Sequence, residues 1–212
     1  MDGDTKVFWD EIWQDESQDS PHFRVSPILV AELTDVPPGN SLEVGCGNGS
    51  DAIWLAKQGW RVTALDFSTA GIDVAKRNAV NAGVDIEFIE ADAATYRPET
   101  AYDLITSFYI QLPPARRVAM FANICRALKP GGRLLFVSHD RSTPIEGWTE
   151  EGHLATLTDA DEIAAELLEL GLELQIERAV KVADLPPIEG EGHGHHGHGG
   201  ETNSTVVIAR SK

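Results

Sequence analysis

The sequence predicts an α/β fold in which a mostly parallel sheet carries helices on both faces. Between residues 40 and 137, short runs rich in β-branched residues alternate with segments of helical period. Alternating units of this length are typical of parallel strands joined by crossover helices. Two further runs near the end of the chain alternate apolar and polar positions, which indicates an antiparallel hairpin at a sheet edge.

Periodicity and end signals assign the elements of this sheet. We expect parallel strands at 40–44, 61–65, 86–90, 102–107 and 132–137. We expect crossover helices near 50–58, 69–82 and 114–128. Glycine and proline end helices, and here the end signals are Gly59, Gly83 and Pro130-Gly131-Gly132.

The two ends of the chain differ from this core. Residues 5–35 have the pattern of two helices separated by Pro21. A helix near 159–170 precedes the alternating runs, which are 172–183 and 204–211. We expect one domain over 1–212, made of an N-terminal helical cap 1–38, a core 39–140 and a C-terminal part 141–212 that includes a His-rich loop 190–200.

The composition is that of a globular protein with a strong negative charge. Of 212 residues, 42% are hydrophobic and 24% are charged, and the net charge is −17. Lysine and arginine grip nucleic-acid phosphates, so this balance argues against a nucleic-acid partner. The apolar runs are too short to cross a bilayer, no secretory signal begins the chain, and Cys46 and Cys125 give no disulfide framework. We therefore expect a cytoplasmic protein with no membrane partner.

A glycine-rich turn, SLEVGCGNGS at 41–50, follows the first strand directly. A dinucleotide-binding turn has the pattern G-x-G-x-x-G, but Ser50 stands where its third glycine is required. Glu43 would repel a pyrophosphate and would favour a ligand with a cationic end. No G-K-[ST] follows, so this is not the phosphate loop of nucleoside triphosphatases. NAD-dependent redox chemistry is therefore disfavoured, and a plain tight turn remains as the structural alternative.

The pattern E-x-G-x-G-x-G resembles the first motif of the class I S-adenosylmethionine (SAM)-dependent methyltransferases. The resemblance implies a Rossmann-like, seven-stranded, mostly parallel sheet with an antiparallel C-terminal hairpin, and SAM as the cofactor. It also implies cofactor contacts from the ends of successive strands, at Glu43, Gly45, Cys46, Gly47, Gly49, Asp66, Phe67, Asp92, Ala93, Ser107 and Phe108.

The spacing of the later motifs supports this resemblance. Asp66 ends the second strand, 17 residues after Gly49, where a carboxylate can accept hydrogen bonds from both ribose hydroxyls. Phe67 could lie against adenine, and Asp92 stands where the family binds the adenine amino group. Taken singly, such acids could also be solvated loop residues, but open α/β sheets bind ligands where several strands end together.

The family resemblance extends to a subfamily. Residues 45–68 are most similar to the small-molecule branch that includes tellurite-resistance and thiopurine-type methyltransferases, and the opening FWDEIWQDE also fits that branch. The resemblance implies methyl transfer to a small-molecule acceptor. A thiol, a metalloid or a similar soft nucleophile is favoured, since such acceptors need little help from a base.

Three residues are candidates for contact with the acceptor. Tyr109 follows the fourth strand directly, and His139 ends the fifth strand with an imidazole suited to general base work. Trp13 lies four residues after Trp9, so that a helix would present both rings on one face as an aromatic lid. The alternatives are that the tryptophans anchor their helix to the core and that His139 bonds to local backbone.

A histidine-rich tract stands outside the methyltransferase pattern. It includes His193, His195, His196 and His198 among glycines and carboxylates. Imidazole and carboxylate can bind zinc, nickel or copper, but glycine-rich flanks do not preorganise a tight site. We therefore assign no metal ligands. The alternative function is a metal- or metalloid-binding protein that uses this loop on a methyltransferase-like scaffold.

Overall fold

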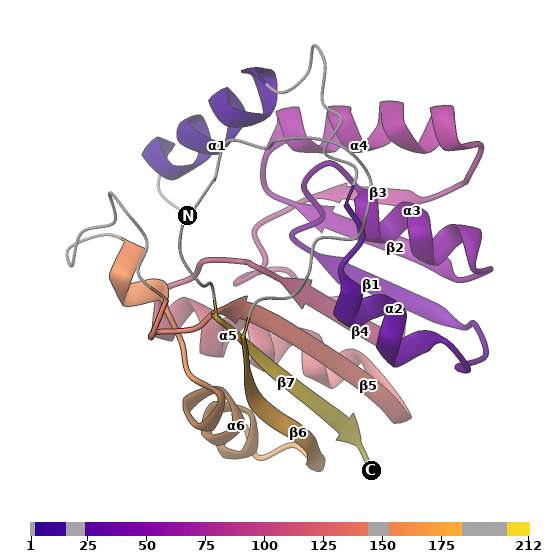
Figure 1. Cartoon of the computed structure of the whole chain (residues 1–212). Helices are drawn as coiled ribbons and strands as arrows, with labels where there is room; N and C mark the ends of the chain where they lie inside the picture. The colour runs from indigo at the N-terminus through magenta and orange to yellow at the C-terminus, as the bar shows by residue number, and fades with distance from the viewer. Residues whose placement is uncertain (1–2, 16–23, 144–152, 184–202) are drawn as a thin grey trace. The chain divides into compact units, whose positions relative to one another are not determined.

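The computed structural model describes residues 3–15, 24–143, 153–183 and 203–212 (Figure 1). The described residues fall into two compact units, one up to Ala93 and one from Ala94 onward. The predicted His-rich loop 190–200 lies outside the described residues. That the whole chain 1–212 forms a single domain stays a prediction.

The first unit holds three parallel strands in the order β3-β2-β1. Its elements are α1 (Gly3–Asp15), α2 (Pro27–Leu33), β1 (Asn40–Val44), α3 (Ser50–Lys57), β2 (Arg61–Asp66), α4 (Thr69–Ala82) and β3 (Glu87–Glu90). Helix α4 is fixed at both ends, because Ser68 Oγ accepts a hydrogen bond from Gly71 N and Gly83 adopts a left-handed conformation. Figure 1 shows α1 lying beside α4, and these two helices are in contact.

The second unit holds four strands in the order β4-β5-β7-β6. Its elements are β4 (Tyr102–Phe108), α5 (Pro114–Ile124), β5 (Leu128–His139), α6 (Ala160–Glu169), β6 (Leu174–Ala183) and β7 (Asn203–Ser211), with single 3-10 turns at Cys125–Ala127 and His153–Thr156. Strands β4 and β5 are parallel, whereas β7 pairs antiparallel with both β5 and β6. Helix α6 packs on the β6–β7 pair.

The predicted fold class is confirmed, since seven mostly parallel strands end in an antiparallel C-terminal pair. The inner strands are buried along nearly their whole length, as expected for a sheet covered by helices. No helix in the described part of the chain has the length and apolar character needed to span a membrane.

One predicted boundary is wrong, at the junction of α5 and β5. Helix α5 ends at Ile124, and β5 begins at Leu128 rather than at 132. Tyr102 already pairs with Leu128, and the register then shifts before Leu104 pairs with Arg133. The Pro130-Gly131-Gly132 segment fills this irregularity, because a Cβ on Gly132 would lie 2.9 Å from the Tyr102 carbonyl oxygen. These residues therefore belong to the strand and do not end the helix.

Candidate functional site

The glycine turn after β1 requires left-handed backbone at three alternate positions. Gly45, Gly47 and Gly49 have φ values of 79°, 50° and 80°, a region that side chains disfavour. The amides of Gly45 and Cys46 both donate to the Leu65 carbonyl, at 2.7 and 2.9 Å, which ties the turn to the end of β2. The turn therefore presents bare backbone at the carboxyl end of β1, where parallel sheets bind ligands.

Glu43 lies buried beneath this turn without a full set of partners. Its side chain is 5% exposed, and its Oε2 atom has no hydrogen-bond partner among the described residues. Burial, together with the nearby Asp51 and Asp66 carboxylates, raises the pKa of Glu43 well above its usual range. Two buried acids, Glu43 and Asp66, thus share one small region with the half-buried Asp51, and we call these three residues the acid cluster.

Asp51, in the first turn of α3, is the member that the sequence analysis missed. Its Oδ1 atom accepts a hydrogen bond from the Ser26 amide at 2.7 Å. Burial raises the pKa of Asp51 to about 6, although the Ser26 bond acts in the opposite direction. The acid cluster is therefore costly to ionise unless a positive charge comes to it.

Asp66, at the end of β2, joins the glycine turn to the loop before α4. Its two carboxylate oxygens accept hydrogen bonds from Gly47 N and from Ser68 N, both at 2.9 Å. Burial raises the pKa of Asp66 in spite of these bonds. A carboxylate has about four lone-pair positions, so Asp66 keeps acceptor capacity for a ligand after both amides are satisfied.

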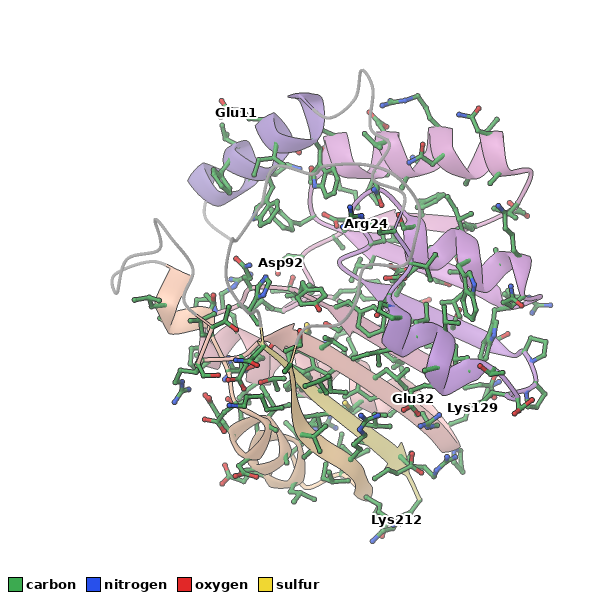
Figure 2. All side chains as sticks on the ribbon, in the orientation of Figure 1. Glu11, Arg24, Glu32, Asp92, Lys129 and Lys212 are labelled. Atoms are coloured by element: carbon green, nitrogen blue, oxygen red, sulfur yellow. The ribbon has the colours of Figure 1, made fainter. Side chains whose placement is uncertain are left out.

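The remaining predicted contacts of the first unit follow β2 and β3. Phe67 is half-buried directly after Asp66, and Asp92 and Ala93 are half-buried in the turn after β3 (Asp92 is labelled in Figure 2). The Ala91 amide donates to the Asp66 carbonyl at 2.9 Å, which holds the two strand ends together. The first unit thus brings the predicted contacts Glu43 to Ala93 to one edge of its strands.

Trp13 reaches the same edge from α1. A Cβ atom on Gly47 would lie 2.7 Å from Trp13 Cζ2, and one on Gly71 would lie 3.1 Å from Trp13 Cδ1. The indole therefore covers the middle glycine of the turn and the first turn of α4. Two other residues of α1, Lys6 and Asp10, contact the β2–α4 loop, and the sequence analysis did not select them. The sequence does hold a signal for them, because Lys6 lies four residues before Asp10 and Asp10 lies three residues before Trp13, so a helix presents all three on one face.

The predicted contacts of the second unit gather around the end of β4. Ser107 is fully buried, and its hydroxyl has no hydrogen-bond partner among the described residues. Tyr109, just beyond Phe108, has a φ of 55°, the one positive value outside glycine in the described chain. Such strain in a bulky residue persists only where its surroundings hold it, and it is frequent at functional sites.

Tyr109 and His139, two of the three predicted acceptor contacts, lie together in the second unit. Their ring centroids are 4.9 Å apart with an interplanar angle of 44°. The Tyr109 amide donates to the Val137 carbonyl at 2.7 Å, and its hydroxyl lies 3.0 Å from Ser204 Oγ on β7. Ser204 was not predicted, and strand pairing places it opposite His139.

Neither cysteine in the structure is suited to nucleophilic chemistry. Cys46 and Cys125 are both buried and free of disulfides. Burial raises the pKa of the Cys46 thiol and raises that of Cys125 to about 12. Within the described ranges no group of His, Cys, Asp and Glu could hold a metal ion, and the four histidines 193, 195, 196 and 198 lie outside those ranges.

Comparison with known proteins identifies relatives of this site. Residues 42–132 match the family model described as a methyltransferase domain. The ubiquinone biosynthesis O-methyltransferase of Salmonella newport (strain SL254) is 29% identical over 139 residues, covering 61% of this chain and 56% of that protein. The chain thus matches little more than half the length of this curated relative.

Solved structures with a similar fold are more distant in sequence. TehB from Haemophilus influenzae has a TM-score of 0.69 and 19% identity, over 89% of this chain and 63% of its own. The N-methyltransferase NodS from Bradyrhizobium japonicum WM9, in complex with S-adenosyl-L-homocysteine (SAH), has a TM-score of 0.66 and 18% identity, over 96% of this chain and 98% of its own. These likenesses concern the fold.

Proposed function

We propose that this chain, in which residues 42–132 match the methyltransferase domain family, is a class I SAM-dependent methyltransferase that binds SAM and methylates a small-molecule acceptor. The observation that carries the proposal is the acid cluster beneath the glycine turn. Glu43 holds a buried oxygen atom with no partner among the described residues, beside Asp51 and Asp66. A buried carboxylate is stable when a cation or a hydrogen-bond donor meets it, so the cluster suits a cationic ligand.

SAM fits these residues better than a nucleotide does, because it carries an ammonium and a sulfonium and no phosphate. When bound, SAM supplies a methyl group that the sulfonium activates for displacement. We propose that Glu43 accepts hydrogen bonds from the ammonium group and that Asp66 accepts them from the ribose. The adenine would lie among Phe67, Asp92 and Ala93, and further contacts would come from Gly45, Cys46, Gly47, Gly49, Ser107 and Phe108.

The acceptor would be held by Tyr109, His139 and Trp13, the three residues predicted for this role. Methyl transfer is an in-line displacement, so these side chains act chiefly by orienting the acceptor and excluding water. We favour a thiol, a metalloid or a similar soft nucleophile, as the sequence of residues 45–68 suggests. Such acceptors are anionic or electron-rich without a base.

A hydroxyl acceptor is the second candidate, and one observation favours it. The imidazole of His139 lies against the Tyr109 ring, where it could remove the proton of a phenolic hydroxyl. The matched O-methyltransferase of Salmonella acts on oxygen by its name. The substitution His139→Asn distinguishes the two candidate acceptors. It should lower turnover of a phenol by about a hundredfold and should change turnover of a thiol little.

Cofactor binding is tested by thermal unfolding with SAM or SAH. Either ligand should raise the melting temperature of the whole chain, as any ligand of the native state does. Asp66→Asn should abolish most of this shift, because Asn cannot accept as many hydrogen bonds. Asp85→Asn, at an exposed acid in the α4–β3 connection, is the matched control and should leave the shift unchanged. No shift with millimolar ligand in the unmutated chain would contradict the proposal.

The acceptor class is tested by a screen with labelled SAM. Thiols, metalloid oxyanions, phenols and amines are compared for labelled product, with His139→Asn measured beside the unmutated chain. Product from thiols or metalloids that survives His139→Asn supports the soft-nucleophile proposal. Product restricted to phenols and lost in His139→Asn supports the hydroxyl acceptor instead.

The metal-binding alternative differs from both methyltransferase candidates because it requires the tract around 190–200. Deleting that tract should leave SAH binding unchanged if the chain is a methyltransferase. If the chain is a metal-binding protein, Asp66→Asn should leave its function intact and the deletion should remove it. A cytoplasmic location remains part of the proposal and is tested by fractionation of cells that express the chain.

A further inference from the structure

We infer that Lys6 and Asp10 of α1 are positioning residues for the cofactor site, and that docking of α1 and binding of the cofactor strengthen each other. The inference rests on the proposed SAM binding. It concerns two charged residues outside the glycine motif, both on the face of α1 that contacts the β2–α4 loop.

Lys6 joins the ends of two strands through its ammonium group. The Nζ atom donates to the Phe67 carbonyl at 2.6 Å, to Thr69 Oγ1 at 2.8 Å and to Glu90 Oε1 at 3.1 Å. Phe67 follows β2, and Glu90 ends β3. One cation from α1 therefore fixes the strand ends that carry the proposed ribose and adenine contacts.

Asp10 holds the start of α4. Its Oδ1 atom accepts a hydrogen bond from Ser68 Oγ at 2.6 Å and a longer one from Ala70 N at 3.3 Å. Ser68 is the residue that caps α4, and its amide binds Asp66. Asp10 therefore reaches the acid cluster through a single intervening residue. A carboxylate at a helix N-terminus also meets the favourable end of the helix dipole.

Trp13 completes the contact by covering Gly47 and Gly71 with its indole. A pocket of about 440 Å³ nevertheless remains between α1 and α4, lined by Asp10, Trp13, Thr69, Ala70, Asp73, Val74 and Arg77. The large apolar residues Val7 and Phe8 of α1 are 55% and 47% exposed, so they add little to its packing. Lys6, Asp10 and Trp13 instead make the contacts between α1 and the groups proposed to bind the cofactor.

These contacts make the coupling reciprocal. With α1 docked, Phe67, Ser68 and Thr69 are held in one conformation, and a cofactor that needs that conformation binds without ordering the loop. A bound cofactor in turn fixes the loop and so favours docking of α1. By thermodynamic linkage, the factor by which docking raises cofactor affinity equals the factor by which the cofactor favours docking.

The test measures SAH binding by calorimetry in the whole chain and in variants of α1. Lys6→Met and Asp10→Asn should each raise the Kd for SAH by about tenfold, within the usual range of coupling between sites. Lys6→Arg should recover most of the affinity, because it keeps a cation that can donate to the Phe67 carbonyl. Glu11→Gln is the matched control, since Glu11 is exposed and points away from α4 in Figure 2.

Steady-state kinetics distinguish a positioning role from a loss of overall stability, because a positioning role changes the KM for SAM and leaves kcat unchanged. The KM for SAM should rise in Lys6→Met and Asp10→Asn, and kcat at saturating SAM should stay close to that of the unmutated chain. Backbone hydrogen exchange gives a measurement that needs no variant. SAH should slow exchange of the α1 amides in the unmutated chain, although α1 belongs to no part of the glycine motif.

SAH binding by the unmutated chain tests the proposed function, and SAH binding by the α1 variants tests the positioning role. If the unmutated chain binds no SAH, the proposed function fails, and this inference falls with it. If the unmutated chain binds SAH but both variants bind it equally well, only the inference is overturned. Exchange of the α1 amides that is unchanged by saturating SAH overturns it as well, even where a variant fails to fold.

Discussion

Replacing Asp51 by Asn should stabilise the unliganded protein, and by an amount that depends on pH. Asp51 is a half-buried member of the acid cluster, and desolvation raises its pKa from 3.8 to about 6. A carboxyl whose pKa is raised on folding binds more protons in the folded state, so stability falls as pH rises from about 4 to about 6. Asn carries no charge and can still accept the hydrogen bond from the Ser26 amide.

The size of the effect follows from the pKa difference. At about 1.4 kcal/mol for each tenfold change in the protonation equilibrium, the shift from 3.8 to about 6 corresponds to about 3 kcal/mol. The unmutated chain bears this cost above about pH 6, and Asp51→Asn removes it. The free energy of unfolding of the variant, minus that of the unmutated chain, should therefore be larger at about pH 8 than at about pH 4, by about 2.5 kcal/mol, because part of the change has already occurred at about pH 4.

Urea unfolding followed by circular dichroism at the two pH values measures this difference. Asp85→Asn, at an exposed acid, is the control and should show no comparable dependence on pH. The prediction fails if Asp51→Asn gives the same change in unfolding free energy at both pH values, or if it destabilises the chain at about pH 8. Either result would mean that Asp51 is not ionised at a cost in the folded protein.

Three further predictions concern packing and pairing. Gly47→Ala should lower the free energy of unfolding by about 2 kcal/mol, because the residue has a positive φ and its new Cβ would contact Trp13. Gly83→Ala also has a positive φ but has open space around it, so it should lower the free energy less in the same urea experiment. Tyr109→Phe should lower the free energy of unfolding by about 1 kcal/mol through loss of the Ser204 hydrogen bond, and it should leave SAH affinity unchanged. In a double-mutant cycle, adding Ser204→Ala to this variant should lower the free energy of unfolding little further. Arg117→Met should lower the free energy of unfolding by about 3–5 kcal/mol, because Glu162 and Glu166 lose their ion pairs with a fully buried guanidinium. Lys129→Met, which breaks an exposed ion pair with Asp103, should lower it by under about 1 kcal/mol.

Local signals predicted those parts of the fold in which neighbours along the chain decide the structure. Helix α4 begins and ends where the sequence indicates, because Ser68 caps it and Gly83 takes a left-handed conformation. The glycine turn is similar, since its three positive φ values follow from three glycines within five residues. The prediction at Pro130-Gly131-Gly132 is wrong, because the pattern of a helix end is also that of an irregular strand start.

The missed parts of the site depend on contacts between distant residues. Ser204 meets Tyr109 from 95 residues away through strand pairing, and no local pattern marks it. Asp51 looks like an ordinary acid in the first turn of a helix, and only the packing of α3 places it beside Glu43. Lys6 and Asp10 have the spacing of any charged helix face, and their role depends on which surface α1 contacts.

Whether Glu43 meets the positive charge of the cofactor can be measured with two ligands and two proteins. Calorimetry compares SAH, which has the ammonium group, with 5′-methylthioadenosine, which lacks the amino-acid part. Glu43→Gln should weaken SAH by at least about tenfold and leave 5′-methylthioadenosine within about twofold, as expected for loss of a charge-assisted hydrogen bond. An equal loss for both ligands, or no loss for SAH, would mean that Glu43 does not bind the ammonium group.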